Sequence, residues 1–148
     1  MPEYSDIYVI SDKRDRKTID KFLRDFIPNR EECADEYEIP QFSAKPVIVF
    51  KKADELIDYC EKNKNTEHAI YWRSIKGSRP EYGMVFYLSD GYVIYGLSTD
   101  ATNQKYAMNL LEEMKEYFGS GHGYIGHEAS PDVDSYTAFL KQEAAHQS

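Results

Sequence analysis

Few of the residue patterns that mark common catalytic or metal-binding sites occur in this sequence of 148 residues. It contains only two cysteines, Cys33 and Cys60, which lie far apart and lack a C-x-x-C partner. Since paired cysteines usually frame a structural zinc site, we expect no metal, and no other pattern implies a cofactor. The chain has neither a Walker A loop nor a G-x-S-x-G nucleophile motif. A Ser-His-Asp triad is recognised by geometry, so the sequence alone leaves a hydrolase open.

The sequence is also short of positive charge and of long apolar runs. It has 18 Lys and Arg against 26 Asp and Glu, which gives a formal net charge of −8. Nucleic-acid binding is not expected, because phosphate contacts need clustered basic residues. No apolar stretch approaches the roughly 20 residues that span a membrane, and the N-terminal residues lack the pattern of a signal peptide. We therefore expect a cytoplasmic protein that binds no membrane. The negative charge suits either an ordinary soluble protein or one whose protein partner is basic.

Hydrophobic residues, by contrast, are sufficient for one packed domain over residues 1–148. They make up 41% of the chain, and 13 residues are tyrosines. Apolar, β-branched runs predict strands at Asp6–Ser11, Pro46–Lys51, Ala69–Ile75, Gly83–Ser89, Tyr92–Ser98 and Tyr124–His127. Helical periodicity predicts helices at Asp15–Ile27, Ala53–Asn63, Ala101–Phe118 and Asp134–Gln142. The predicted fold is α+β, with a mixed, partly antiparallel sheet, three main helices and a short C-terminal helix.

Helix ends can be assigned from residues that satisfy free backbone groups. Asp12 or Asp15 can cap the first helix, and Thr99 or Asp100 can cap the long third helix. Gly119 stands where a left-handed residue commonly ends a helix. These positions fix the expected boundaries of the longest helices.

A hairpin is predicted between the two most apolar strands. Asp90-Gly91 separates them, and this dipeptide favours a type I′ turn, in which both central residues have positive φ. The preceding strand is apolar on both faces, with Met84, Phe86 and Leu88 alternating with Val85 and Tyr87. We therefore expect these strands to lie centrally in the sheet.

The stretch Gly121–Gly126 matches G-x-G-x-x-G, the spacing of a dinucleotide-binding loop. That loop must follow a strand and open a helix, whereas this stretch follows a helix and enters a strand. The adjacent His122, His127 and Glu128 raise the question of a metal or acid–base site. In an extended chain the two histidines point to opposite faces, and His122 and Glu128 are about 20 Å apart. We expect solvent-facing histidines, and glycines that end the helix and allow close packing.

An acidic segment precedes the second predicted strand. Asn29–Lys45 has no clear periodicity, and it contains Glu31, Glu32, Asp35, Glu36 and Glu38. One interpretation is an ordinary solvated loop. The other is an electrostatic patch that attracts a basic partner, since long loops are often functional.

A second segment concentrates basic and aromatic residues. It contains Trp72, Arg73, Lys76, Arg79 and Tyr82 in an otherwise acidic chain. It is either a solvated connection between strands or a recognition loop, because these residue types are enriched at binding hot spots. An acidic ligand or phosphate is a weaker interpretation of the same residues.

The complete pattern resembles a known group of proteins. A single acidic α+β domain of this length, rich in Tyr, Asp and Glu and without a catalytic motif, resembles the bacterial immunity proteins that neutralise polymorphic or contact-dependent toxins. The stretch Ser89–Ser98 followed by a long helix, and then Gly123–Glu128, is similar in layout to several of them. The resemblance implies a stoichiometric inhibitor that covers a toxin's active site or a neighbouring surface. Many nuclease toxins are basic, which suits the negative charge of this chain.

Three functional hypotheses follow from the sequence. The first is a non-enzymatic protein-binding domain of the immunity type, with aromatic anchors in the two segments. The second is a structural or regulatory domain that forms a homo-oligomer. The third is a small enzyme or small-molecule binder with a pocket near Trp72, Arg73, His122 and His127. The partner-binding residues of the first hypothesis are Glu31, Glu32, Asp35, Glu36, Tyr37, Glu38, Trp72, Arg73, Arg79 and Tyr82.

Overall fold

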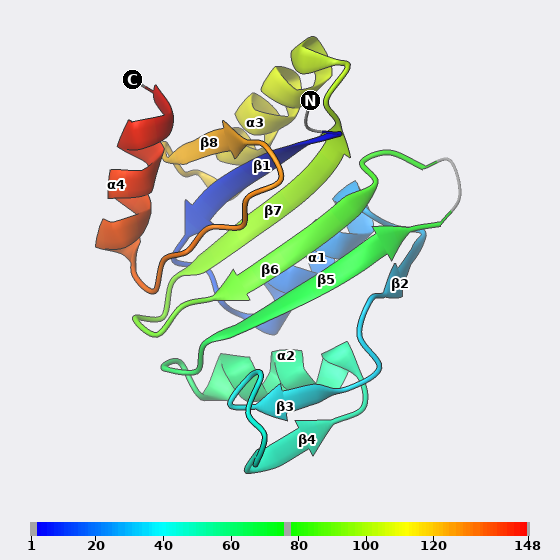
Figure 1. Cartoon of the computed structure of the whole chain (residues 1–148), viewed down its shortest axis with the longest axis vertical. Coiled ribbons are helices and arrows are strands. Elements are labelled where there is room, and N and C mark those ends of the chain that lie inside the picture. The colour runs from blue at the N-terminus through cyan, green and yellow to red at the C-terminus, as the bar shows by residue number, and fades with distance from the viewer. Residues whose placement is uncertain (1–2, 76–77, 148) are drawn as a thin grey trace.

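The computed structural model describes residues 3–75 and 78–147. They form four helices and two antiparallel sheets, joined by turns and loops (Figure 1). The helices are α1 (Arg16–Phe26), α2 (Ala53–Lys62), α3 (Gln104–Phe118) and α4 (Tyr136–Gln147). The strands are β1 (Tyr4–Ser11), β2 (Arg30–Glu32), β3 (Tyr37–Ile39), β4 (Ile48–Phe50), β5 (His68–Ser74), β6 (Tyr82–Tyr87), β7 (Val93–Asp100) and β8 (Gly123–Gly126). The predicted α+β class is confirmed.

The larger sheet has the strand order β2-β5-β6-β7-β1-β8, and each of these neighbouring pairs is antiparallel. The sequence predicted a mixed sheet, and the described strands contain no parallel neighbours. The sheet is antiparallel because β1 lies between β7 and β8 and runs opposite to both. β7 and β8 therefore share a direction without touching, and α3 is the crossover helix that joins them.

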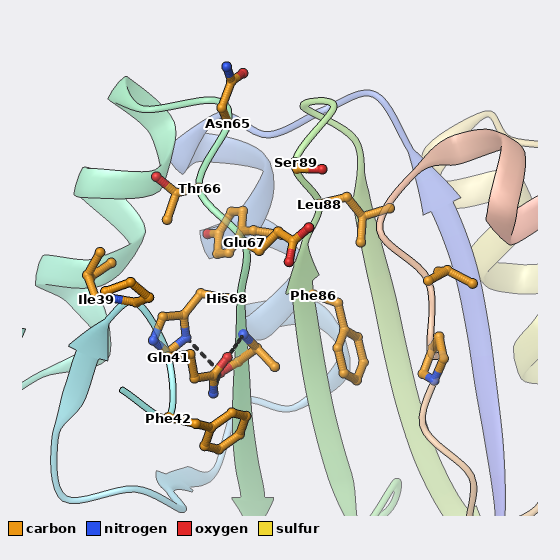
Figure 2. A pocket seen from close by; sticks show the side chains of 15 residues that line it. Ile39, Gln41, Phe42, Asn65, Thr66, Glu67, His68, Phe86, Leu88 and Ser89 are labelled. Atoms are coloured by element: carbon orange, nitrogen blue, oxygen red, sulfur yellow. Dashed lines mark hydrogen bonds between the residues drawn. The ribbon is translucent and has the colours of Figure 1, made fainter. Parts of the chain in front are cut away.

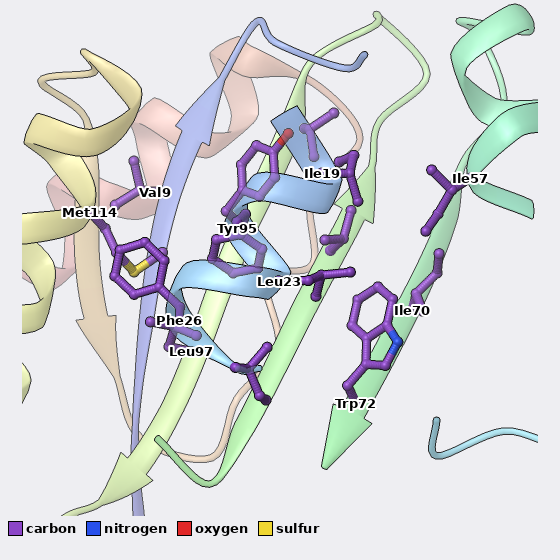
Figure 3. Close-up of a cluster of buried hydrophobic side chains, with 14 of the residues drawn as sticks. Val9, Ile19, Leu23, Phe26, Ile57, Ile70, Trp72, Tyr95, Leu97 and Met114 are labelled. Atoms are coloured by element: carbon purple, nitrogen blue, oxygen red, sulfur yellow. The ribbon is translucent and has the colours of Figure 1, made fainter. Parts of the chain in front are cut away.

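Both faces of the larger sheet are apolar, as the alternation in β6 predicted. Val85 and Tyr87 belong to a core cluster with residues of α1, α2 and α3, part of which Figure 3 shows. Met84, Phe86 and Leu88 belong to a second cluster on the opposite face. We call this opposite face the open face, because α1 and α2 cover the other one.

The predicted N-terminal cap is confirmed for α1 but not for α3. Asp15 caps α1 with its side chain, as predicted. Asn103 caps α3, so the prediction of Thr99 or Asp100 was wrong. Both of those residues belong to β7, which continues further than its apolar run because it pairs with β1 along its whole length. Gly119 is left-handed, with φ of 63°, and ends α3 as predicted.

The hairpin between β6 and β7 is confirmed, but its turn differs from the prediction. The Leu88 amide donates to the Tyr92 carbonyl at 2.9 Å, and the Gly91 amide donates to the Leu88 carbonyl at 3.2 Å. Gly91 has φ of 94°, but Asp90 does not have the positive φ that a type I′ turn requires. The loop is thus a three-residue turn with one left-handed glycine, and not type I′. The Asp90 carboxylate accepts from the Tyr92 amide and, at 2.7 Å, from the Tyr136 amide that begins α4.

The segment predicted as a loop, Asn29–Lys45, contains two short strands. β2 pairs with β5 at the edge of the larger sheet, and β3 pairs with β4 in a separate two-stranded sheet. Each of these strands has three residues, which is too short for an alternating pattern to be visible. The predicted strand Pro46–Lys51 therefore exists as β4, but it lies outside the larger sheet.

Arg14 is a buried cation that joins the ends of several elements. Its guanidinium donates to the carbonyls of Cys60 at 2.9 Å and Leu88 at 3.0 Å. It also donates to the carbonyls of Asn63 at 3.2 Å and Thr66 at 2.8 Å. Burial lowers the pKa of this guanidinium from its ordinary value, although arginine stays charged in proteins. One side chain thus ties the end of α2 to the end of β6.

Candidate functional site

The open face is covered unevenly. α4 lies over its β8 end, and the chain between β8 and α4 crosses in front of the sheet. At the other end, Tyr71 of β5 remains 37% exposed. Phe42 and Val47, in the loop between β3 and β4, are 88% and 83% exposed. Large exposed apolar side chains that gather in one region mark interaction sites.

A cavity of about 600 Å³ opens on this side of the molecule, and we call it the β5 hollow (Figure 2). Ala69 of β5 and Phe86 of β6 contribute to its lining from the sheet. Residues 39–42 border it from the smaller sheet, and Pro131 and Val133 border it from the chain that leads to α4. The small side chain of Ala69 beside the ring of Phe86 leaves room for a ligand group.

Gln41 closes the outer edge of β5 next to this hollow. Its side-chain nitrogen donates to the Ala69 carbonyl at 3.2 Å, and its side-chain oxygen accepts from the Ala69 amide at 2.8 Å. β2 covers the same edge further along, where the Cys33 amide donates to the Tyr71 carbonyl. The Gln41 amide therefore occupies the place that the backbone of a neighbouring strand would take.

His68 is a buried histidine at the rim of the hollow. Its Nε2 lies 2.9 Å from the Glu38 carbonyl, and its Nδ1 lies 3.1 Å from the Ala69 carbonyl. Burial is the largest influence and lowers the pKa of His68, while the two carbonyls act in the opposite direction. The ring lies between β3 and β5, and in its neutral form it donates to only one of the two carbonyls.

We expect the wild type to lose stability relative to His68→Gln as the pH falls below 6.5, the ordinary pKa of histidine. Because the folded-state pKa is the lower one, the unfolded state binds the proton first, and acid favours unfolding. Glutamine does not titrate in this pH range, so the variant lacks this dependence of stability on pH. Urea unfolding of both proteins at about pH 7.5 and pH 5 measures the difference. A difference that does not change with pH would contradict this role of His68.

Phe42 is both exposed and strained. Its φ is 65°, a left-handed conformation that bulky residues rarely adopt. The conformation is held by the Phe42 amide, which donates to the Glu38 carboxylate at 2.8 Å. A strained backbone that presents an aromatic ring to solvent has no evident benefit for folding, and such positions concentrate at binding sites.

Acidic residues occur in two of the segments that border the β5 hollow. Glu67 lines it, and Asp132 and Asp134 alternate with the residues that form its border before α4. All three acids are exposed, and none forms an ion pair with another described residue. Residues 127–135 contain no lysine or arginine. The surroundings of the hollow therefore attract positive charge.

Two residues of the predicted acidic patch are paired with cations. Glu31 lies 2.7 Å from Arg73, and Glu36 lies 2.9 Å from Lys51. All four side chains are about half exposed or more, so these pairs contribute little to stability. Their charges are nevertheless largely compensated within the chain.

Other acidic residues of that segment have local structural roles. The Glu32 carboxylate accepts from the Tyr37 hydroxyl at 2.8 Å and from the Ala53 amide, where α2 begins, at 2.9 Å. Glu38 holds the β3–β4 loop, as described above. Asp35 is exposed. The acidic segment is therefore not a free solvated loop, because several of its carboxylates bind the chain's own groups.

The predicted aromatic anchors differ in exposure. Tyr37 and Trp72 are 2% and 3% exposed and belong to the core, so they offer almost no surface to a partner. Tyr82 is half-buried, and Arg79 is exposed beside it in a shallow cavity of about 250 Å³. Lys76, in the same predicted loop, lies outside the described residues.

The pocket predicted near Trp72 and the histidines is not formed. Trp72 lies in β5, and three strands separate β5 from β8, beside which both histidines lie. His122 Nδ1 is 3.0 Å from the Glu143 carboxylate of α4, and the same carboxylate accepts from the Gly123 amide. His127 is exposed. The described residues also contain no cluster of His, Cys, Asp and Glu suited to a metal ion.

Reasoning from sequence alone missed Gln41, Phe42 and Ala69. None of them belongs to a motif, and the Gln41–Ala69 contact joins positions that are distant in the chain. One signal was available: Phe42 lies between Pro40-Gln41 and Ser43, where turn residues enclose a lone aromatic residue. Its exposure depends on a tertiary arrangement that this signal does not specify.

Comparison with known proteins yields no family model, curated protein or solved structure that matches this chain. Within residues 3–75 and 78–147, no helix combines the length and the apolar character that crossing a membrane requires.

Proposed function

We propose that this protein is a non-enzymatic protein-binding domain that docks through the open face. The observation that carries the proposal is the combination of the β5 hollow with the exposed, strained Phe42 at its border. Val47, in the same loop, is also largely exposed. Interfaces commonly place a few apolar or aromatic anchors at the centre of a polar rim.

The proposed partner is a basic protein. Glu67 lines the hollow, Asp132 and Asp134 flank its lining residue Val133, and none of the three acids forms an ion pair with another described residue. The chain as a whole carries a formal net charge of −8. Complementary charge accelerates association and excludes acidic competitors.

The immunity type is the specific form of this proposal. An inhibitor of a toxin needs a stable, complementary surface and no catalytic residues of its own. The open face provides such a surface beside a rigid six-stranded sheet. The resemblance in composition and layout supports the same function, and a basic toxin domain would suit the charge of the rim.

The experiment is co-expression with the protein encoded by the adjacent gene, followed by titration of the purified pair. We expect a stoichiometric complex and protection of the host from growth inhibition. Phe42→Asp should weaken binding about ten-fold or more, because it removes an aromatic anchor. Met108→Asp is the matched control, since Met108 is 60% exposed on α3, away from the open face.

Two results would contradict the proposal. One is the absence of binding to any neighbouring gene product, including complexes formed by refolding the two chains together. The other is equal binding by the Phe42→Asp and Met108→Asp variants, which would place the interface elsewhere.

A homo-oligomeric domain is the second candidate. β4 belongs to a two-stranded sheet, and Val49 within it is 42% exposed next to Val47. An edge strand with exposed β-branched residues can pair with a second copy. Sedimentation at high salt, where repulsion between the acidic chains is screened, tests this candidate. A monomer under those conditions would exclude it.

A further inference from the structure

We infer that the β5 hollow takes an extended segment of the partner protein, which replaces the Gln41 side chain on the backbone of Ala69. In this arrangement an apolar side chain of the segment fills the space above Ala69, and lysine or arginine residues flank it. The inference rests on the proposed function and specifies how its surface is used.

The first argument is the hydrogen bonding of the β5 edge. Both polar backbone groups of Ala69 point away from β6, because both bind Gln41. A partner strand would offer a carbonyl and an amide at the same positions. When a partner strand replaces the Gln41 side chain, two hydrogen bonds are lost and two equivalent ones form. The amide and the carbonyl of Ala69 therefore both keep a partner.

The second argument is side-chain geometry. Residues that face each other on neighbouring strands project to the same face of a sheet. Ala69 projects to the open face together with its cross-strand partner Phe86. A residue paired with Ala69 on the outer side would thus place its side chain in the β5 hollow. A hollow of about 600 Å³ accommodates such a group and its neighbours.

The third argument is charge. Glu67 lines the hollow two residues before Ala69, and Asp132 and Asp134 are the sequence neighbours of Val133, which lines it from the other side. A segment with basic residues on either side of its apolar residue would neutralise these acids. A second copy of this chain is disfavoured as the occupant, because its formal net charge of −8 opposes an acidic rim.

Gln41 has a distinct role in this arrangement. In the free protein it protects an edge that would otherwise pair with other chains. In the complex only the Gln41 side chain is displaced, and Phe42 stays beside the hollow as an anchor. Removing the Gln41 amide should therefore strengthen binding of the partner, whereas removing a residue that contacts the partner should weaken it.

The test is selection of a random twelve-residue peptide library, displayed on phage, against the full chain. Enriched peptides are synthesised and titrated into the wild type, Ala69→Trp, Gln41→Met and Met108→Trp. We expect peptides with an apolar residue between lysines or arginines. Their affinity should fall at least about ten-fold in Ala69→Trp, stay unchanged in Met108→Trp and rise several-fold in Gln41→Met.

Other outcomes would overturn the inference. These are the absence of enriched peptides, enrichment of acidic peptides, equal binding by Ala69→Trp, or weaker binding by Gln41→Met. Ala69→Leu is a smaller obstruction that keeps the test valid if the tryptophan variant does not fold. If the natural complex is sensitive to Phe42→Asp but not to Ala69→Trp, the proposed function stands and this binding mode is wrong.

Discussion

Arg14→Met is expected to lower the free energy of unfolding by about 3 kcal/mol or more. The wild-type guanidinium donates to four backbone carbonyls, three of which lie in and after the last turn of α2. Methionine fills a similar volume but donates no hydrogen bond, so the most buried of these carbonyls lose their partner. Arg14 also lies over the ring of Tyr87, 4.8 Å from its centroid, and that contact is lost as well.

Two further variants make this prediction specific. Arg14→Lys keeps the charge, but its compact ammonium cannot reach carbonyls on several sides, so it should recover only part of the loss. Arg24→Met is the matched control, because Arg24 is 70% exposed and is paired with its sequence neighbour Asp25; it should change stability by about 0.5 kcal/mol or less. Urea unfolding followed by circular dichroism measures all three. Equal stability of the two methionine variants would refute the structural role of Arg14.

Gly123→Ala is expected to destabilise the protein by about 2–3 kcal/mol. A Cβ at this position would lie 2.6 Å from the backbone oxygen of Tyr8 and 2.8 Å from Val9 Cγ2. It would also lie 3.0 Å from Leu111 Cδ1 of α3. The first contact is with the backbone of β1, which pairs on both sides, so β8 must move away from β1 to relieve it.

The same glycine-rich stretch provides the control. An added Cβ at Gly121 meets nothing within 4 Å, so Gly121→Ala should be neutral or slightly stabilising through the unfolded state. Thermal unfolding of both variants compares positions two residues apart with the same substitution. Equal effects of the two alanines would mean that β8 is not held against β1 as described.

Local patterns in the sequence were sufficient for much of the fold. α1 begins after Asp15 and α3 ends at Gly119 because each residue acts on its own neighbours. The alternation in β6 predicted the two apolar faces because side-chain direction follows residue parity. Interactions of this kind act over a few residues, so the sequence displays them directly.

Features that depend on distant contacts could not be predicted. Trp72 was expected at a binding surface, since its residue type is common there, but α1 and α2 bury it. Glu32 was expected to attract a partner, yet it receives hydrogen bonds from Tyr37 and from the start of α2. The β5 hollow arises from four chain segments, which are residues 39–42, 65–69 and 86–89 and the pair Pro131 and Val133, and no local pattern encodes their meeting.

The internal position of β1, between β7 and β8, also constrains when the sheet can be completed during synthesis. β1 is made before its partners, which are residues 93–100 and 123–126. A growing chain must therefore keep this apolar strand, which includes Ile7 and Val9, from pairing wrongly until most of the protein has left the ribosome. Expression yield should consequently depend more on the rate of translation and on chaperones than the final stability of the protein would suggest.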